Sequence, residues 1–440
     1  MLGGEPPAGE APAGDASPSG ADGGECATNV AERAAPGDVS GSMLGKTILN
    51  TAILGLHCLW YDLIGRWSLP VLAQTLLLMS PLKLGFNYAD RCEVRSVITI
   101  YFFAVSAPAI PCWCVARRGK TAKALLAAYM AWYLLFDSAP KRGGRFLPVL
   151  RRRVFWKHFA AYFPNKLTRT AKLDPKRNYI FGYHPHGIIS VGAFCNFATE
   201  GTGFSKLFPG IDLRLLTLAM NFRLPFFREY LLGVGVNDAS RDSILNNLRR
   251  GPGASVMLVV GGARESLESA PGAYSLVLEN RKGFVKLALT TGASLVPVFS
   301  FGETDLFGVW QNARLQKIQL MMQKRMGFAI PLFFGRALTG GILHRVFGFN
   351  KGVMPLRMPV HCIVGRPIHV EAAVAKPTQE QIDSLHALYV EELQKIYRTW
   401  KADFMEERAR ALEEAGERRK NILEKGNFGL ERRRTLDFVA

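Results

Sequence analysis

Two histidines one proline apart are the residues of this chain best placed to do chemistry. His184 and His186 stand in YHPHG, directly after the apolar run at 179–183, which has the composition of a buried strand. Gly187 permits a tight turn into a following helix. Ligands in open α/β sheets bind beyond the carboxyl ends of strands, where the positive end of a helix stabilises developing negative charge. The pair therefore lies where a catalytic site is expected.

The two imidazoles allow three interpretations: a metal site, a general base, or a pair that packs in the core. A metal site needs further ligands, but the other histidines are isolated and the seven cysteines are scattered without CxxC spacing. We therefore predict no metal site. A general base needs a near-neutral imidazole whose second nitrogen is held by a carboxylate or a carbonyl. We favour the general base, with His186 preferred to His184.

A carboxylate for this base is available at the end of another expected strand. The segment MLVVGGARESL at 257–267 places Glu265 just after two glycines. If the two strands are neighbours, this carboxylate can reach an imidazole across the strand ends. The alternative is a first-turn helix acid stabilised by the helix dipole. Covalent catalysis is disfavoured because Ser190 and Cys195 lack the GxSxG context of a nucleophile elbow.

Basic residues near these segments are candidates for binding phosphate. Arg228 lies beside aromatic residues in NFRLPFFREY, and Arg281 and Lys282 precede Gly283 in NRKGFVK. Charge-assisted hydrogen bonds from these side chains can hold phosphate oxygens, while solvated helix faces are the alternative. The formal net charge of +19 suits an anionic partner. No zinc-finger spacing, basic zipper or RNP-like run is present, so nucleic acid is not an expected partner.

From about residue 164 onward, strands alternate with amphipathic helices, which predicts an α/β fold with a mixed sheet and flanking helices. The expected strands cover 179–183, 213–219, 255–262, 294–301 and 360–365. The expected helices cover 239–251 and 280–292, followed by a long helix within 377–404. This domain, residues 138–405, must position the histidines, the glutamate and the basic residues.

The flanks of this domain have other compositions. With 48% hydrophobic residues, the chain can fill a core and still supply apolar sequence to a bilayer. Residues 1–42 predict a disordered tail, 43–95 an apolar segment that is a candidate for the membrane interface, and 406–440 a charged tail. Residues 96–137 predict a membrane hairpin, because 96–116 carries no charge and is long enough to cross ~30 Å of hydrocarbon. Buried core helices are the alternative. Basic residues after 137 place the following domain on the cytosolic side.

Several segments together resemble the type-2 diacylglycerol acyltransferase family, which includes monoacylglycerol and wax-alcohol acyltransferases. The matching segments are YFP at 162–164, YHPHG at 183–187, NFRLPFFREYL at 221–231, VVGGARESL at 259–267, ENRKGFVKLAL at 279–289 and VPVFSFGETDLF at 296–307. The family is similar to glycerolipid acyltransferases that carry a His-x4-Asp motif. Here Ile189 and Val191 occupy the positions of that aspartate. The group that orients the base must therefore come from elsewhere, and Glu265 is the candidate.

The resemblance implies a glycerolipid acyltransferase-like enzyme that transfers a fatty acyl group from acyl-CoA, its co-substrate, to the hydroxyl of diacylglycerol without a further cofactor. His186 would remove the hydroxyl proton, amides near Gly187 would stabilise the oxyanion, and Arg228, Arg281 and Lys282 would bind the CoA phosphates. The resemblance further implies an endoplasmic-reticulum membrane or lipid-droplet location with a cytosolic catalytic domain; a homo-oligomer is left open. Monoacylglycerol or a long-chain alcohol is the alternative acceptor. A metal-dependent lipid hydrolase and a noncatalytic lipid-droplet protein are the rivals from other classes.

Overall fold

The computed structural model describes residues 93–100, 119–309, 332–336, 351–352, 354–414 and 436–439, with the single residues 115, 319 and 321. The chain divides into two compact units, Met1–Cys58 and Leu59–Ala440, and all described residues belong to the second. The predicted disordered tail and nearly all of the apolar segment at 43–95 lie outside the described residues. So does most of the first arm of the predicted hairpin.

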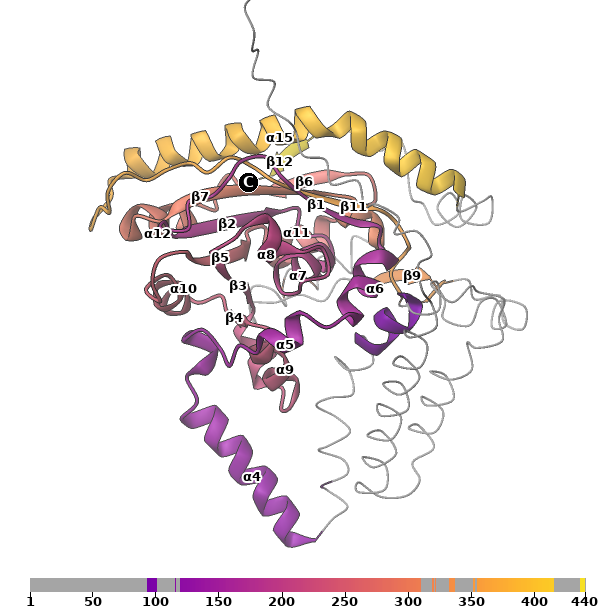
Figure 1. The fold of residues 1–440 in the computed structure, drawn as a ribbon, viewed down its shortest axis with the longest axis vertical. Helices are drawn as coiled ribbons and strands as arrows, with labels where there is room; N and C mark the ends of the chain where they lie inside the picture. Colours follow the sequence, from indigo (N-terminus) through magenta and orange to yellow (C-terminus); the bar gives the residue numbers. More distant parts are fainter. Residues whose placement is uncertain are drawn as a thin grey trace, which may run out of the picture. The chain divides into compact units, whose positions relative to one another are not determined.

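A mixed seven-stranded sheet with the order β1-β11-β7-β2-β5-β3-β4 forms the centre of this unit (Figure 1). Its strands are β1 (Asn165–Arg169), β2 (Tyr179–His184), β3 (Asp212–Thr217), β4 (Val236–Asp238), β5 (Ala254–Val259), β7 (Ser294–Phe301) and β11 (Val360–Val364). Strands β7, β2, β5, β3 and β4 are all parallel, whereas β11 runs antiparallel to β7 and pairs with β1 in parallel. The carboxyl ends of β7, β2 and β5 therefore meet at one edge of the sheet. The predicted mixed sheet is confirmed.

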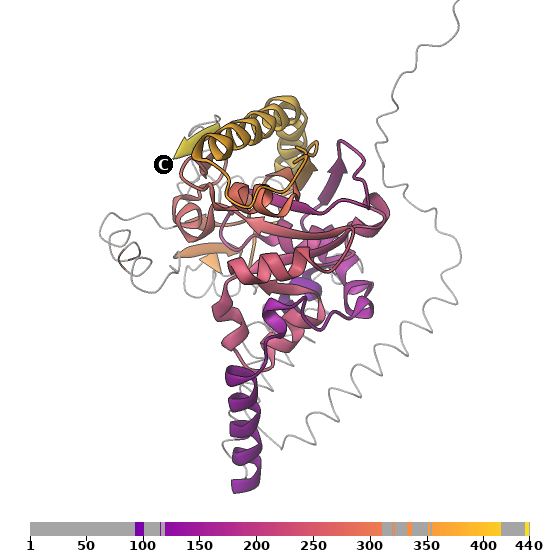
Figure 2. The ribbon, with the colours of Figure 1, turned by 90° about the vertical axis from the view of Figure 1, so that its left-hand side faces the viewer.

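Helices cover both faces of the sheet (Figures 1 and 2). One face packs in a cluster with side chains of α6 (Phe155–Tyr162), α7 (Val191–Phe197) and α8 (Phe204–Leu207). The other packs with α10 (Arg241–Leu248), α12 (Gly283–Thr291) and α15 (Gln379–Glu414). Successive residues of a strand point to opposite faces, so Tyr183 lies on the α7 face and His184 lies on the α15 face.

The described part of the chain contains further elements. They are α4 (Lys120–Leu135), η2 (Ala139–Lys141), α5 (Pro148–Arg151), η3 (Ala219–Arg223), α9 (Phe227–Gly233), α11 (Gly262–Glu268), β6 (Tyr274–Val277), η4 (Glu303–Leu306), β8 (Gly308–Val309), β9 (Phe333–Arg336), β10 (Lys351–Gly352) and β12 (Leu436–Val439). Strand β12 pairs in parallel with β6, and β8, β9 and β10 form a small antiparallel sheet.

Helix α15 continues past the predicted boundary at residue 405. Arg408 is buried on it, and its Nε lies 2.6 Å from Oδ2 of Asp305 in η4. This buried ion pair fixes the last turns of α15 to the sheet unit. The charged end predicted from residue 406 thus begins as the last turns of α15, and Arg408 is the residue in it that is buried rather than solvated.

Helix α4 corresponds to the second arm of the predicted hairpin. Its 16 residues pack through Tyr133, whose hydroxyl donates to the Arg223 carbonyl at 2.9 Å, and through Tyr129, which donates to Glu229 Oε1 at 3.0 Å. The opposite side is apolar and exposed, with Leu135 at 74%. Within the described ranges, no helix is both long and apolar enough to cross a bilayer. The hairpin therefore stays a prediction.

Candidate active site

Three loops meet where β2, β5 and β7 end. The HPHG turn follows β2, the glycines before α11 follow β5, and Gly302 and Glu303 follow β7. The strands are in register, since Tyr183 of β2 pairs with Val259 on one side and Val298 on the other. The predicted neighbour relation between the first two of these strands is confirmed. The turn with both histidines consequently lies between two acidic side chains, Glu265 and Glu303.

Glu265 reaches the histidine turn, but it binds the backbone rather than an imidazole. Its Oε1 accepts the backbone N–H of His186, and its Oε2 accepts that of Val277 at 3.1 Å. A Cβ on Gly261 would lie 1.8 Å from Oε2, so only glycine leaves room for this carboxyl group. Burial raises the pKa of Glu265 to about 7, opposed by the two hydrogen bonds. The prediction that Glu265 contacts an imidazole is wrong, and its position makes it an anchor for the turn.

The imidazole of His186 is oriented by a carbonyl group. Its Nδ1 lies 3.1 Å from the Gly187 carbonyl oxygen. A carbonyl can only accept, so Nδ1 carries the proton and Nε2 carries the lone pair. The side chain is half-buried, and burial lowers the pKa of His186 below its usual value. His186 is therefore a neutral imidazole with a lone pair on Nε2, which is the state that a general base requires.

The imidazole of His184 is fully buried beneath α15. Its Nε2 lies 3.0 Å from the Tyr389 hydroxyl, and that hydroxyl donates to the Gly182 carbonyl at 3.0 Å. Because the hydroxyl has one proton, Nε2–H of His184 must donate to it. Nδ1 then carries a lone pair with no partner among the described residues. Burial lowers the pKa of His184 to about 3, so the ring is neutral. The contacts of His184 indicate a role in packing.

We expect Tyr389→Phe to lower the free energy of unfolding by about 1–3 kcal/mol, because it leaves the buried Nε2–H of His184 without an acceptor. Turnover at the site should change little, since His186 is untouched. Tyr179→Phe is the matched control: this tyrosine is equally buried, and its hydroxyl donates to the Asp174 carbonyl at 3.0 Å without accepting from a buried histidine. Thermal unfolding of the purified variants measures the difference. Equal destabilisation by both substitutions would contradict the proposed role of Tyr389.

Glu303 is a site residue that sequence reasoning missed. Its Oε2 accepts the Tyr183 hydroxyl at 2.6 Å and the Gly192 N–H at 2.9 Å, while Oε1 has no partner in the described part of the chain. Burial raises the pKa of Glu303 to about 7. A Cβ on Gly187 would lie 2.7 Å from Glu303 Cγ, so the turn packs directly on this side chain. The available signal was an acid that follows the strand at 294–301 after a single glycine.

The three basic residues predicted to bind phosphate lie in different environments. Arg228 is only 1% exposed, and its guanidinium donates to Asp137, Glu229 and the Phe222 carbonyl. These contacts leave no accessible face for a phosphate, so Arg228 is a structural residue and the prediction for it is wrong.

Lys282 is held by a carboxylate, whereas Arg281 is not. Nζ of Lys282 lies 2.7 Å from Asp383 Oδ1. Arg281 is exposed, and no described carboxylate forms an ion pair with it. Of the three predicted residues, Arg281 is the one placed to meet a ligand.

The arrangement supports proton transfer at the tip of β2. Nε2 of His186 carries a lone pair that can accept a proton, and the Gly187 N–H has no hydrogen-bond acceptor among the described residues. Such an N–H group can stabilise an oxyanion. Across the residues that the structure describes, no three His, Cys, Asp or Glu side chains gather in the way that a metal ion requires.

Comparison with known proteins identifies the family. The sequence profile described as diacylglycerol acyltransferase matches residues 120–413. Diacylglycerol O-acyltransferase 2A of Umbelopsis ramanniana is 42% identical over 328 residues, which are 73% of this chain and 87% of that protein. The 2B protein of the same organism is 45% identical over 290 residues, covering 64% and 80%. Human 2-acylglycerol O-acyltransferase 1 is 45% identical over 281 residues, covering 63% and 81%. The predicted acyltransferase class is confirmed, and the chain belongs to the diacylglycerol acyltransferase family.

Proposed function

We propose that this chain transfers a fatty acyl group from acyl-CoA to the free hydroxyl of diacylglycerol and so makes triacylglycerol. The observation that carries the proposal is the state of His186. Its Nδ1 is fixed by the Gly187 carbonyl, its Nε2 is left to accept a proton, and it stands at the carboxyl end of β2. The relatives named diacylglycerol O-acyltransferase support the choice of substrates.

In the proposed reaction, Nε2 of His186 takes the proton of the acceptor hydroxyl as its oxygen attacks the thioester carbonyl carbon. The carbonyl electrons move to the oxygen, and the Gly187 N–H stabilises that oxyanion. The oxyanion then collapses, the carbon–sulfur bond breaks, and the CoA thiolate takes the proton from the imidazolium. The products are an ester and CoA. General-base assistance of this kind contributes roughly 10²–10⁴-fold to a rate.

The two buried acids hold the turn in the geometry that this reaction needs. Glu265 binds the backbone N–H of His186 from the β5 side, and Glu303 packs against Gly187 from the β7 side. Within the described residues, neither carboxyl group forms a hydrogen bond with the His186 ring. Both are therefore positioning residues. They hold the histidine in place, as the missing aspartate of the His-x4-Asp motif would, but they do so through the turn and not through the imidazole ring.

Monoacylglycerol is a second candidate acceptor. The human and bovine proteins named 2-acylglycerol O-acyltransferase 1 are each 45% identical to this chain, as is the diacylglycerol O-acyltransferase 2B of Umbelopsis ramanniana. Identity to relatives therefore does not separate the two acceptors. Both offer a hydroxyl on an acylglycerol, so the same base chemistry applies.

We further propose that the acceptor reaches the site from the endoplasmic-reticulum membrane or a lipid droplet. The exposed apolar side chains of α4 and its C-terminal cap support this, with Leu125 at 68%, Leu135 at 74% and Phe136 at 76%. Basic residues follow directly, and Lys141 and Arg142 among them are exposed. An apolar surface bordered by cations suits an anionic lipid–water interface.

Microsomes containing the full chain, supplied with labelled acyl-CoA and either diacylglycerol or monoacylglycerol, test the proposed function. We expect label in triacylglycerol, with a larger kcat/KM for diacylglycerol. Preference for monoacylglycerol would select the second candidate. Label released as free fatty acid without ester formation would contradict acyl transfer and favour a hydrolase. Unchanged lipid in all arms would favour a noncatalytic protein.

A further inference from the structure

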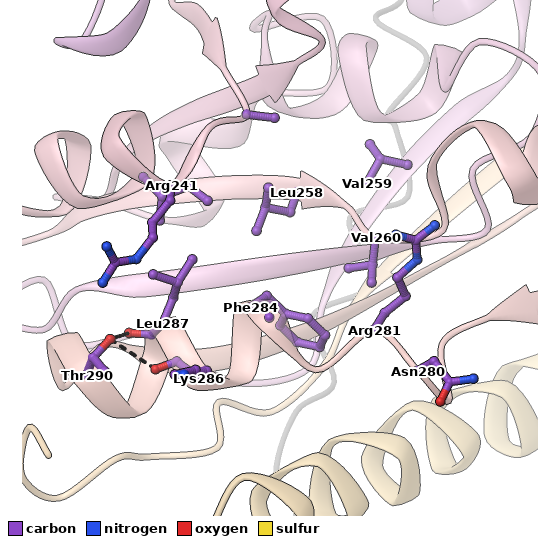
Figure 3. A pocket seen from close by; sticks show the side chains of 13 residues that line it. Arg241, Leu258, Val259, Val260, Asn280, Arg281, Phe284, Lys286, Leu287 and Thr290 are labelled. Carbon is purple, nitrogen blue, oxygen red and sulfur yellow. Dashed lines mark hydrogen bonds between the residues drawn. The ribbon is translucent and has the colours of Figure 1, made fainter. Parts of the chain in front are cut away.

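A large groove opens on the face of the sheet that α10 and α12 cover (Figure 3). We call it the α10–α12 groove. Its volume is about 620 Å³, within the range of ligand sites. Leu258 of β5 and Val260, just after that strand, form its floor, and Ile244, Phe284 and Leu287 add apolar walls. The groove is therefore large enough for a sizeable organic ligand with an apolar part.

Three cations line the same groove. Arg241 begins α10, Arg281 precedes α12, and Lys286 lies on α12, and all three are exposed. In the part of the chain that the structure describes, none of the three forms an ion pair with a carboxylate. The groove lining contains no aspartate or glutamate. The lining of the groove is thus positively charged and complements a ligand with several negative charges.

The groove adjoins the active site. The ring of Phe284 in its wall lies 5.0 Å from the ring of Tyr389, whose hydroxyl binds His184. At the end nearest the β5 loop, the positive charge of Arg281 acts on Glu265, the anchor of the His186 turn. Figure 3 shows Arg281 and Arg241 at opposite ends of the row formed by Leu258 and Val260. A ligand lying along the groove can therefore extend towards the reacting histidine.

We propose that the α10–α12 groove binds the nucleotide end of acyl-CoA, with Arg241, Arg281 and Lys286 contacting its phosphates. This rests on the proposed function, since it takes acyl-CoA as the acyl donor. Acyl-CoA carries a 5′-diphosphate and a 3′-phosphate next to an adenine ring, which matches cations around an apolar floor. Lys282, paired with Asp383, lies outside the lining and is not part of this site.

The double variant Arg241→Gln, Lys286→Gln tests the site in the full-length chain. We expect the KM for acyl-CoA to rise about 10-fold, because two charge-assisted contacts in an open groove are lost. The kcat and the KM for the lipid acceptor should stay within about twofold. Added salt should raise the KM of the wild type more than that of the variant, because fewer charge contacts remain to be screened.

The matched control is Lys206→Gln, Arg249→Gln, which removes the same net charge from exposed positions outside the groove. It should keep the wild-type KM for acyl-CoA. The fragment 3′-phosphoadenosine 5′-diphosphate should bind the wild type, as measured by calorimetry, and bind the groove variant about 10-fold more weakly.

The outcomes separate the two proposals. A wild-type KM for acyl-CoA in the groove variant would overturn the groove assignment while leaving acyl transfer intact. So would weaker binding of that variant to phosphatidylserine vesicles with an unchanged KM, since the groove would then hold a lipid headgroup. If the wild type shows no acyl-CoA-dependent turnover, the proposed function fails. Binding of 3′-phosphoadenosine 5′-diphosphate then still tests the groove assignment. Equal affinity of this fragment for the wild type and the groove variant would overturn that assignment.

Discussion

Replacing His186 by glutamine is expected to slow acyl transfer by roughly 10²–10⁴-fold, the range typical of a lost general base. The free energy of unfolding should change by less than about 1 kcal/mol, because the side chain is half-buried and loses only its bond to the adjacent Gly187 carbonyl. Single-turnover rates and thermal unfolding of the same preparations measure both quantities. The glutamine side chain keeps a similar size and polarity, so a loss of rate would report on proton transfer.

The pH dependence of kcat/KM tests the role of His186 independently. Burial lowers the pKa of His186 below 6.5, so the neutral base form predominates already in mildly acidic solution. The log of kcat/KM should rise with pH to a plateau, with the midpoint of the acid limb below pH 6.5. The glutamine variant should lack the part of this limb that His186 causes.

His184→Gln is the control, and it should behave in the opposite way. His184 is fully buried and its Nε2–H donates to Tyr389, so the substitution replaces a packed ring by a flexible chain and breaks a buried contact. Destabilisation of about 2–4 kcal/mol is expected. The folded fraction of this variant should transfer acyl groups faster than His186→Gln. If it is folded and slower than the His186 variant, the assignment of the base is reversed.

The central sheet could be predicted because its strands are apolar and bounded by turn residues. The strand expected at 294–301 corresponds residue for residue to β7, and the helices expected at 239–251 and 280–292 contain α10 and α12. Strand β1, with the sequence NKLTR, has no apolar alternation, and β4 has three residues, so neither carries a readable pattern. These two segments are recognisable as strands only through their pairing with β11 and β3.

The candidate site was predictable to the level of loops but not of atoms. Parallel strands bring their carboxyl ends together, which placed Glu265 beside the HPHG turn. Sequence spacing cannot tell whether a carboxylate meets a ring or a backbone N–H, and here it meets the N–H of His186. Glu303 required knowing that β7 is the other neighbour of β2. Arg228 was misassigned because its partner Asp137 lies 91 residues earlier.

Glu303→Gln is expected to change how stability depends on pH. Burial raises the pKa of Glu303 from 4.5 to about 7 in the folded chain. Between these pH values the folded state retains a proton that the unfolded state has released, so the free energy of unfolding falls as pH rises. Glutamine has no such proton. Relative to wild type, the variant should gain stability on the order of 3 kcal/mol between pH 4.5 and 7. Buried His184, whose pKa is lowered, makes the free energy of unfolding rise with pH. This effect is the same in both proteins, so it cancels in the difference between them.

Glutamine fits at position 303 because one carboxyl oxygen is unpartnered among the described residues. Its amide oxygen can take the bonds from Tyr183 and Gly192, and its NH₂ group can occupy the place of Oε1.

At Glu265 both oxygens accept backbone N–H groups, so glutamine would set an NH₂ group against an N–H. Glu265→Gln should therefore destabilise the fold by about 1–3 kcal/mol even at pH 8, where an ionised wild-type carboxylate serves both donors. Chemical unfolding of the three proteins from pH 5 to 8 compares them directly. A stability difference between Glu303→Gln and wild type that does not vary with pH would mean that Glu303 is already ionised in the folded site.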